Sequence, residues 1–146
     1  MASSVRFSRG FAEIVLIVAE VSRSATFYRD VVGLIPETEV SPEWAWFWAG
    51  EPGISQRLAL HRGPLLFEEH SPLPLGTPRF GPIHFAFAVE STELEAAAAK
   101  VRCAGVTVYG PTRLEWMRAV SYYFYDPDGN LLEWWSRDPD TAPPSC

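Results

Sequence analysis

The sequence has little cysteine, little histidine and no long hydrophobic run. Among 146 residues there are two cysteines, three histidines and two methionines. No apolar stretch reaches the roughly 18 residues that span a bilayer, so we expect no membrane partner. Arginines near the N-terminus precede an apolar run that Glu13 and Glu20 interrupt, which is not the pattern of a signal peptide. Cys103 falls in an expected helix and Cys146 ends the sequence, so we expect no structural disulfide and a reducing, cytoplasmic location.

Positive charge is also scarce. Lysine and arginine together number 12 against 18 acidic residues, which leaves a net charge of −6. A protein that binds a nucleic acid duplex needs a basic stripe, and none is visible, so nucleic acid is not an expected partner. Hydrophobic residues make up 47% of the chain and charged residues 21%, which is a globular composition. The length suits one ordinary domain or two half-size units that share a core.

The first half has the pattern of one strand, one helix and three strands. Phe11–Ala19 is apolar and β-branched apart from Glu13, which predicts a strand buried on both faces. Ser22 can cap a helix over Arg23–Val32, and Gly33 supplies its left-handed stop. Weaker strand signals follow at Glu37–Val40, Trp44–Ala49 and Gln56–His61.

The same order returns after a linker. Residues 71–82 contain four prolines and two glycines, which predicts a stiff connection. A strand follows at Ile83–Val89. Thr92 and Glu95 have the spacing of a capping box for a helix over Glu93–Ala104. Further elements are a helix stop at Gly105, strands at Val106–Tyr109, Val120–Asp126 and Leu131–Trp135, and a turn at Asp126–Gly129.

An internal duplication accounts for this repeated order. Glu13 in the first half corresponds to His84 in the second, and a helix and three strands follow each. The predicted fold class is α+β, with two βαβββ modules that form a curved mixed sheet around a central concave pocket. The predicted boundaries are an N-terminal extension at 1–10, a first module at 11–70, the linker at 71–82, a second module at 83–137 and a tail at 138–146.

Three polar residues stand inside apolar strands. Glu13, His84 and Glu133 share strand faces with apolar or small neighbours, and a pseudo-twofold axis would bring them to one concavity. A buried carboxylate costs several kcal/mol unless it is paired or bound to a cation. A divalent ion would remove the conflict between two carboxylates and an imidazole. A salt-bridged polar cluster without metal is the alternative.

Four segments carry a resemblance to a known family. They are Glu13-Ile-Val-Leu-Ile-Val, Phe27-Tyr-Arg-Asp-Val-Val-Gly-Leu, His84-Phe-Ala-Phe-Ala-Val and Asp126-Pro-Asp-Gly-Asn-Leu-Leu-Glu133. Together they resemble the vicinal-oxygen-chelate superfamily, which includes glyoxalases, bleomycin-resistance proteins and extradiol dioxygenases. The resemblance covers roughly Phe11 to Ser136 and implies the paired-module fold. It does not select one reaction, because this fold carries several chemistries.

The resemblance implies a set of metal ligands. By position these are Glu13, His84 and Glu133, and the ion would be Mn, Ni, Co, Zn or Fe. Glu13 stands where the family usually has His or Gln, which disfavours the extradiol branch with its two His and one carboxylate. Ala59 stands at the fourth position and cannot bind a metal. His61, two residues further on the same face, is a candidate replacement or a strand-end surface histidine.

Several aromatic and basic residues are candidates for binding a substrate. Trp44, Trp46 and Trp48 alternate along one strand and therefore share a face, as either a hydrophobic core or dimer contact or a wall for an aromatic ligand. Trp116 and Arg118 fall in a loop where family members often contact substrate. The candidate substrate-binding set is Trp46, Trp48, His61, Trp116 and Arg118.

Two functions from different classes follow. The first is a metal-dependent enzyme with isomerase, lyase or epimerase chemistry on a small oxygenated substrate, in which Glu133 or Glu13 moves a proton. The second is a metal-free protein like the bleomycin-resistance branch that binds an aromatic or cationic small molecule, which the net charge of −6 favours. A module without activity that serves as a partner domain is a third reading. By resemblance we also expect a homodimer.

Overall fold

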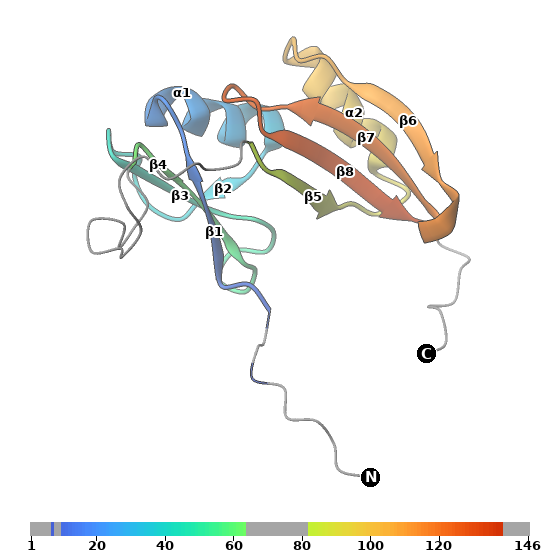
Figure 1. Cartoon of the computed structure of the whole chain (residues 1–146), viewed down its shortest axis with the longest axis horizontal. Helices are drawn as coiled ribbons and strands as arrows, with labels where there is room; N and C mark the ends of the chain where they lie inside the picture. Colours follow the sequence, from blue (N-terminus) through green and yellow to red (C-terminus); the bar gives the residue numbers. More distant parts are fainter. Residues whose placement is uncertain (1–6, 8–9, 64–81, 139–146) are drawn as a thin grey trace, which may run out of the picture. The chain divides into compact units, whose positions relative to one another are not determined.

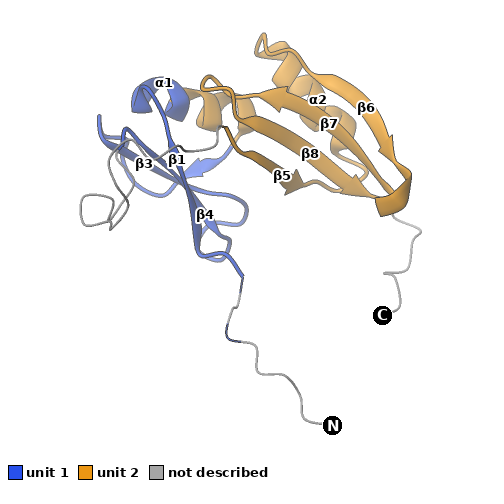
Figure 2. Ribbon diagram, viewed as in Figure 1, with its two compact units in different colours: residues 1–25, 34–70 blue, residues 26–33, 71–146 orange. Residues whose placement is uncertain are grey.

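The computed structural model describes residues 7, 10–63 and 82–138, which form two compact units (Figure 2). Unit 1 comprises Met1–Ala25 and Leu34–His70, and unit 2 comprises Thr26–Gly33 and Ser71–Cys146. Nearly all of the predicted N-terminal extension, linker and tail lies outside the described residues. Cys103 carries a free, exposed thiol, and Cys146 is not among the described residues. In the described ranges, no helix has the length and apolar character needed to cross a membrane.

Unit 1 contains a four-stranded mixed sheet (Figure 1). Its strand order is β1 (Glu13–Ile17), β4 (Arg57–His61), β3 (Trp44–Trp48) and β2 (Ile35–Pro36). β1 runs parallel to β4, while β3 runs antiparallel to both of its neighbours. Alternating residues divide each strand between two faces. The buried set on one face includes Leu16, Ala45, Phe47, Leu58 and Leu60.

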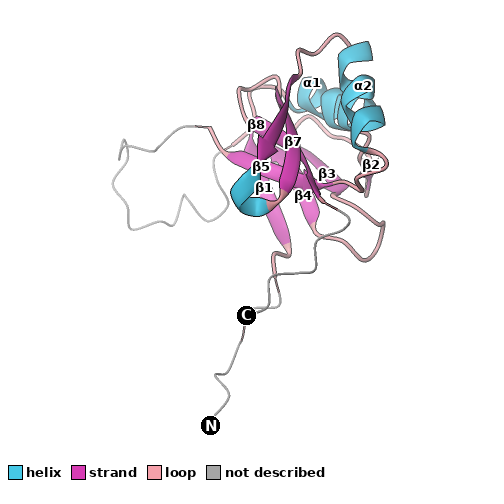
Figure 3. Ribbon diagram, turned by 90° about the vertical axis from the view of Figure 1, so that its right-hand side faces the viewer, coloured by secondary structure: helices cyan, strands magenta, loops and turns pink. Residues whose placement is uncertain are grey.

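Unit 2 contains a sheet with the same order of strands. It runs β5 (His84–Ala88), β8 (Leu131–Arg137), β7 (Ala119–Tyr125) and β6 (Tyr109–Leu114). β5 is parallel to β8, and the other pairs are antiparallel. Helix α2 (Leu94–Cys103) lies along one face of this sheet (Figure 1) and buries Leu94, Ala98 and Val101. The two matching mixed sheets with few helices (Figure 3) confirm the predicted α+β class and the repeated order of strands.

The first helix is divided between the two units. α1 (Val21–Thr26) continues as the π-helical turn η1 (Phe27–Val32), and unit 2 takes the chain from Thr26 onward. Tyr28 is fully buried in unit 2, where its hydroxyl donates to Asp126 Oδ2 at 2.7 Å. Gly33 ends the turn at φ +87°, with its N–H donating to the carbonyl of Tyr28. The left-handed stop predicted at Gly33 is confirmed.

Both predicted helix caps are wrong. The first helix begins at Val21, so Ser22 lies inside it, and the Ser22 hydroxyl donates to Glu20. The second helix begins at Leu94, and within the described chain its N-cap residue Glu93 makes no side-chain cap hydrogen bond. Glu95 does not close a capping box because its carboxylate accepts the hydroxyl of Tyr122 instead. A tertiary hydrogen bond has replaced the local one.

Three strand predictions also need correction. Glu37–Val40 is not a strand. The strand that pairs with β3 covers Ile35 and Pro36, and beyond it the backbone N–H groups of Glu37 and Ser41 donate to carbonyls of β3 without forming a ladder. The strand expected at Val106–Tyr109 begins at Tyr109 and runs on to Leu114. The strand over Phe11–Ala19 is shorter and is not buried on both faces, since the two ends of β1 are exposed. A single layer of sheet in each unit leaves one of its faces uncovered within that unit.

We expect the Tyr28→Phe variant to lower the free energy of unfolding by about 1.5 to 3 kcal/mol, because it removes a buried hydrogen bond to a carboxylate. Burial, followed by the charge of Asp126, raises the pKa of the Tyr28 hydroxyl. The unfolded chain therefore releases this proton at a lower pH than the native one, and stability should fall above about pH 10.

Urea titrations from pH 7 to 11 would measure both effects. Tyr28→Phe should show a smaller loss of stability at alkaline pH than the wild type. Tyr125→Phe, at an exposed tyrosine of β7, is the matched control and should behave as wild type. Equal alkaline losses in Tyr28→Phe and wild type would contradict the assignment.

Candidate functional site

One face of the unit 2 sheet collects polar side chains from three neighbouring strands. Glu133 of β8 pairs in register with Ala86 of β5 on one side and Tyr123 of β7 on the other. His84 and Ser121 stand two residues along those strands, so all share this face. Glu133 is only 5% exposed, whereas half of the His84 side chain is open to solvent. A buried carboxylate thus lies at the side of an accessible imidazole.

Glu133 is held at both of its oxygens. The hydroxyl of Ser121 donates to Oε1 at 2.5 Å. Nε2 of His84 lies 3.1 Å from Oε2, and Nδ1 of the same ring lies 3.2 Å from the carbonyl oxygen of Leu131. Both nitrogens of the ring therefore face acceptors, although a neutral imidazole has only one N–H to donate. A ring that donates from Nδ1 turns its Nε2 lone pair toward Glu133 Oε2 when it is neutral, and it donates to both acceptors when it is protonated.

The spacing of these atoms fits a divalent cation. An N–H donated from Nδ1 to Leu131 leaves the Nε2 lone pair of His84 available as a ligand. Two ligand atoms at about 2.1 Å from one ion and at right angles to each other are about 3 Å apart. The distance of 3.1 Å between His84 Nε2 and Glu133 Oε2 matches that separation and is also the length of a direct hydrogen bond. The nitrogen and oxygen donors suit a transition metal or zinc.

Tyr123 adds a hydroxyl to this face. Burial, and next the negative charge of Glu133, raises the pKa of the Tyr123 phenol. It therefore remains protonated at neutral pH and can donate a hydrogen bond. The ring centroids of Tyr123 and His84 lie 6.2 Å apart, so the two side chains border the same patch of surface.

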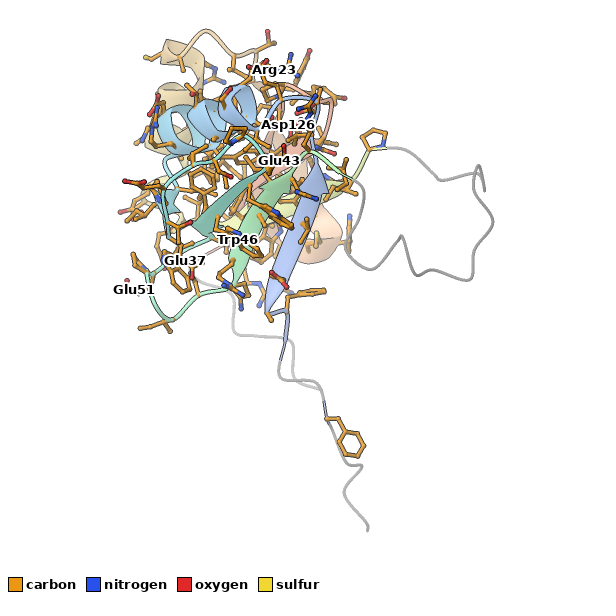
Figure 4. All side chains as sticks on the ribbon, turned by 90° about the vertical axis from the view of Figure 1, so that its left-hand side faces the viewer. Arg23, Glu37, Glu43, Trp46, Glu51 and Asp126 are labelled. Carbon is orange, nitrogen blue, oxygen red and sulfur yellow. The ribbon has the colours of Figure 1, made fainter. Side chains whose placement is uncertain are left out.

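Glu13 lies in unit 1, in an environment of its own. Its register partner is Arg57, whose Nη2 lies 3.8 Å from Glu13 Oε2. Arg57 also approaches Glu37 at 3.4 Å and stands over the ring of Trp46, 4.8 Å from the centroid. Figure 4 labels Trp46 and Glu37, whose side chains lie beside the strands of unit 1. The Glu13 side chain is 36% exposed, which makes it far more accessible than Glu133.

Unit 1 also contains a stack of aromatic rings. Trp44 lies parallel to His61 at 3.8 Å and to Trp46 at 5.3 Å between ring centroids. His61 is 9% exposed, and its Nδ1 lies 2.8 Å from the carbonyl oxygen of Glu43. The reading of His61 as a surface histidine is therefore wrong. Ala59, which stands at the fourth of the ligand positions implied by the family resemblance, is completely buried.

The three tryptophans of β3 do not form the core of unit 1. Trp44, Trp46 and Trp48 are each half-buried, and Ala45 and Phe47 supply the core from the opposite face of the strand. A wall for a ligand and a contact with a second chain both suit such a partly exposed aromatic row.

Trp116 and Arg118 lie in the connection between β6 and β7. Trp116, in the turn η3 (Glu115–Met117), is 81% exposed. Arg118 adopts a left-handed conformation at φ +51°, and its carbonyl accepts the N–H of Asp138. A non-glycine residue in this region of backbone space is uncommon and marks a constrained turn.

The structure gathers some of the predicted site residues and adds others. His84 and Glu133 meet in unit 2, while Glu13 pairs with Arg57 in unit 1. Among the described residues, no group of three or more His, Cys, Asp or Glu side chains is close enough together to hold a metal ion. The sequence analysis did not name Ser121. The predicted turn at Asp126–Gly129 implies a hairpin of β7 and β8, and that hairpin brings Ser121 beside Glu133. No pattern in the sequence indicated a role for Arg57, because its contact with Trp46 depends on the register between β3 and β4.

Known proteins match this chain in sequence and in fold. A sequence profile of the glyoxalase/bleomycin resistance protein/dioxygenase superfamily matches residues 10–134. A virulence protein of Salmonella typhimurium strain LT2 is 28% identical over 123 residues, which are 82% of this chain and 78% of that protein. An integron cassette protein from the mobile metagenome of a Halifax Harbour sewage outfall is 28% identical, with a TM-score of 0.68 over 88% of this chain and 99% of that one.

A lactoylglutathione lyase from Agrobacterium tumefaciens has the same fold. Its TM-score is 0.68 over 90% of this chain and 96% of its own, at 23% sequence identity. The profile match spans both units and includes the His84–Glu133 pair. The chain belongs to the glyoxalase/bleomycin resistance protein/dioxygenase superfamily.

Proposed function

We propose that this chain is a metal-dependent enzyme that acts on a small oxygenated organic substrate. The observation that carries the proposal is the His84–Glu133 pair, whose facing atoms have the spacing of two ligands of one divalent ion. His84 and Glu133 would hold the ion. A bound Mn, Co, Ni, Zn or Fe ion would supply positive charge that stabilises an alkoxide or enediolate as it forms.

Ser121 and Leu131 prepare the pair for this task. The Leu131 carbonyl accepts the Nδ1 proton of His84 and so presents Nε2 as a ligand. The Ser121 hydroxyl occupies Glu133 Oε1, which leaves Oε2 as the oxygen that faces the imidazole. Glu133 is thereby restrained to bind through one oxygen and to keep one orientation.

Glu13 is the better candidate for moving a proton. Proton transfer needs a carboxylate that can approach and leave the reacting group. Glu13 is partly exposed and is joined to Arg57 only by a long contact of 3.8 Å, whereas Glu133 is buried and hydrogen-bonded. We therefore assign the general base or acid to Glu13 and a fixed ligand role to Glu133. Isomerisation, epimerisation and lyase chemistry each need one group that moves a proton and another that holds the ion in place.

The substrate would be recognised by the aromatic and basic residues predicted for this role. They are Trp46, Trp48, His61, Trp116 and Arg118. Trp46 and Trp48 contribute partly exposed rings, and Trp116 contributes an open ring on a constrained turn. The buried ring of His61 supports Trp44 by stacking and so shapes the wall. Arg118 would pair with a carboxylate or phosphate of the substrate. We also expect a homodimer in a reducing cytoplasm.

A metal-free binding protein is the second candidate. The Trp44–Trp46 stack offers a flat apolar surface, and Glu13 and Glu37 lie close to the same Arg57 that covers Trp46. An aromatic cation could take the place of the Arg57 guanidinium on Trp46 and pair with the two carboxylates. The protein would then bind such a drug without any ion.

Metal content is the first test. We expect untagged protein, purified without chelator, to carry about one transition metal ion per chain by inductively coupled plasma mass spectrometry. Glu133→Ala and His84→Ala should lose it, because each removes a ligand. Glu51→Ala, at an exposed acidic residue of unit 1, is the matched control and should keep it. Protein that refuses Mn, Co, Ni, Zn and Fe(II), and whose tryptophan fluorescence a cationic aromatic drug quenches, would support the second candidate instead.

We expect Ser121→Ala to weaken metal binding by about 10- to 100-fold, because residues that orient ligands have effects of this size. Titration with Co(II), followed by its visible absorption, would measure the affinity. A thermal melt would show whether the variant is folded. Unchanged Co(II) affinity in folded Ser121→Ala would refute the role of this hydroxyl.

A further inference from the structure

The polar face of the unit 2 sheet continues beyond the His84–Glu133 pair. Trp135 and Arg137 follow Glu133 at every second position of β8, so the three side chains share one face. Exposure rises along this row, because Glu133 is buried, Trp135 is half-buried and Arg137 is exposed. The proposed function uses the buried end of the row, where the ion would bind. The open end carries an indole and a guanidinium to which that function gives no task.

The guanidinium of Arg137 is held over the ring of Trp135, with its central carbon 5.4 Å from the ring centroid. In the part of the chain that the structure describes, no carboxylate pairs with it. Arg113, in contrast, donates to both carboxylate oxygens of Asp138. The N–H groups of Arg137 therefore remain available for an anion. The planar fork of a guanidinium matches the two oxygens of a carboxylate.

Small side chains leave one side of this row open. The register partners of Glu133 and Trp135 on β5 are Ala86 and Ala88, and both alanines are exposed. β5 is an outer strand of the sheet in this unit (Figure 1). An apolar chain or ring can therefore lie along β8 beside the two alanines and contact the indole of Trp135.

The row also sets the distance between its two charged ends. A strand advances about 3.3 Å per residue, so the guanidinium above Trp135 lies roughly 7 Å along β8 from Glu133. A molecule that reaches both ends needs an oxygen-bearing group at one end and an anionic group at the other. The indole between them favours an apolar connection.

We propose that Arg137 selects the substrate of this site, and that the substrate is an extended organic anion. Its oxygenated end binds at the His84–Glu133 pair, its apolar body lies along Trp135, and a carboxylate at its far end pairs with Arg137. This inference rests on the proposed function, because the first of these contacts needs the ion. It adds a substrate class, which an ion held by His84 and Glu133 does not by itself select.

Two hydroxamates that differ only at the far end are the probes. A hydroxamate offers two adjacent oxygens to a metal ion. Suberic acid monohydroxamate ends in a carboxylate, and its monoamide ends in a neutral carboxamide. Each is titrated into Co(II)-loaded protein and followed by the visible absorption of the ion. We expect the carboxylate probe to bind about three- to tenfold more tightly, which is the effect of a partly exposed charge-assisted pair.

Variants of Arg137 test which residue is responsible. Arg137→Gln should abolish the preference for the carboxylate and leave the affinity of the amide unchanged. Arg137→Glu should reverse the preference, so that the amide binds more tightly than the carboxylate. Arg102→Gln is the matched control, because Arg102 also lies over an aromatic ring, that of Tyr122, but belongs to α2. It should keep the preference of the wild type.

Two results would overturn the role of Arg137 and leave the proposed metal centre in place. One is equal binding of the carboxylate and the amide to wild-type protein. The other is a preference that Arg118→Gln loses and Arg137→Gln keeps, because the carboxylate would then lie at the turn before β7. Failure of the wild type to hold Co(II), or of both hydroxamates to bind the Co(II)-loaded protein, would refute the proposed function and this inference with it.

Discussion

The carboxylate of Asp126, buried in unit 2, accepts hydrogen bonds from three residues. Tyr28 donates its hydroxyl, Asp128 its backbone N–H, and Asn130 both its backbone N–H and its side-chain amide. The turn that joins β7 to β8 and the end of the first helix are thereby tied to one charge. The carbonyl of the Asn130 side chain then accepts the N–H of Ile83, the residue before β5. Without this carboxylate, three separate parts of the chain would lose their common attachment.

The position of the candidate metal ligands follows from that attachment. The N–H of Leu131 donates to the carbonyl of Ile83 where β5 and β8 begin, and His84 follows Ile83 directly. This register places the His84 ring against the Leu131 carbonyl and Glu133 two residues beyond. A slip by one residue would send Glu133 to the opposite face, among the core side chains. The geometry of the site is therefore a consequence of the pairing of β5 with β8, to which the Asp126 cluster is joined at Ile83 and Asn130.

The carboxylates on the polar faces of the two sheets have different partners. In unit 1, Glu13 stays partly exposed and shares Arg57 with Glu37, so its charge is balanced by a partly exposed guanidinium. In unit 2, Glu133 is buried and depends on Ser121 and on the proton or cation at His84. A partly exposed carboxylate is suited to transfer a proton, and a buried one is suited to hold a fixed position. The duplicated strands thus supply two carboxylates with different properties.

Much of this protein follows from patterns that can be read along the chain. The alternation of apolar residues in Trp44–Trp48 and Leu131–Arg137 determined which side chains share a face, and Gly33 determined where the first helix ends. The repeated order of elements determined the fold class, and the motifs around His84 and Glu133 determined the family. These features depend on residues close in sequence, where the period of a strand and the freedom of glycine apply directly.

Tertiary structure decided what each group contacts. Glu95 is bound by Tyr122 and not by its own helix end, and Arg57 stands over Trp46 because β3 and β4 pair in one particular register. Ser121 meets Glu133 only after β7 and β8 pair in register. Such contacts join residues that are far apart in the chain. Their energies compete with local preferences, and the outcome depends on the packing of the whole unit.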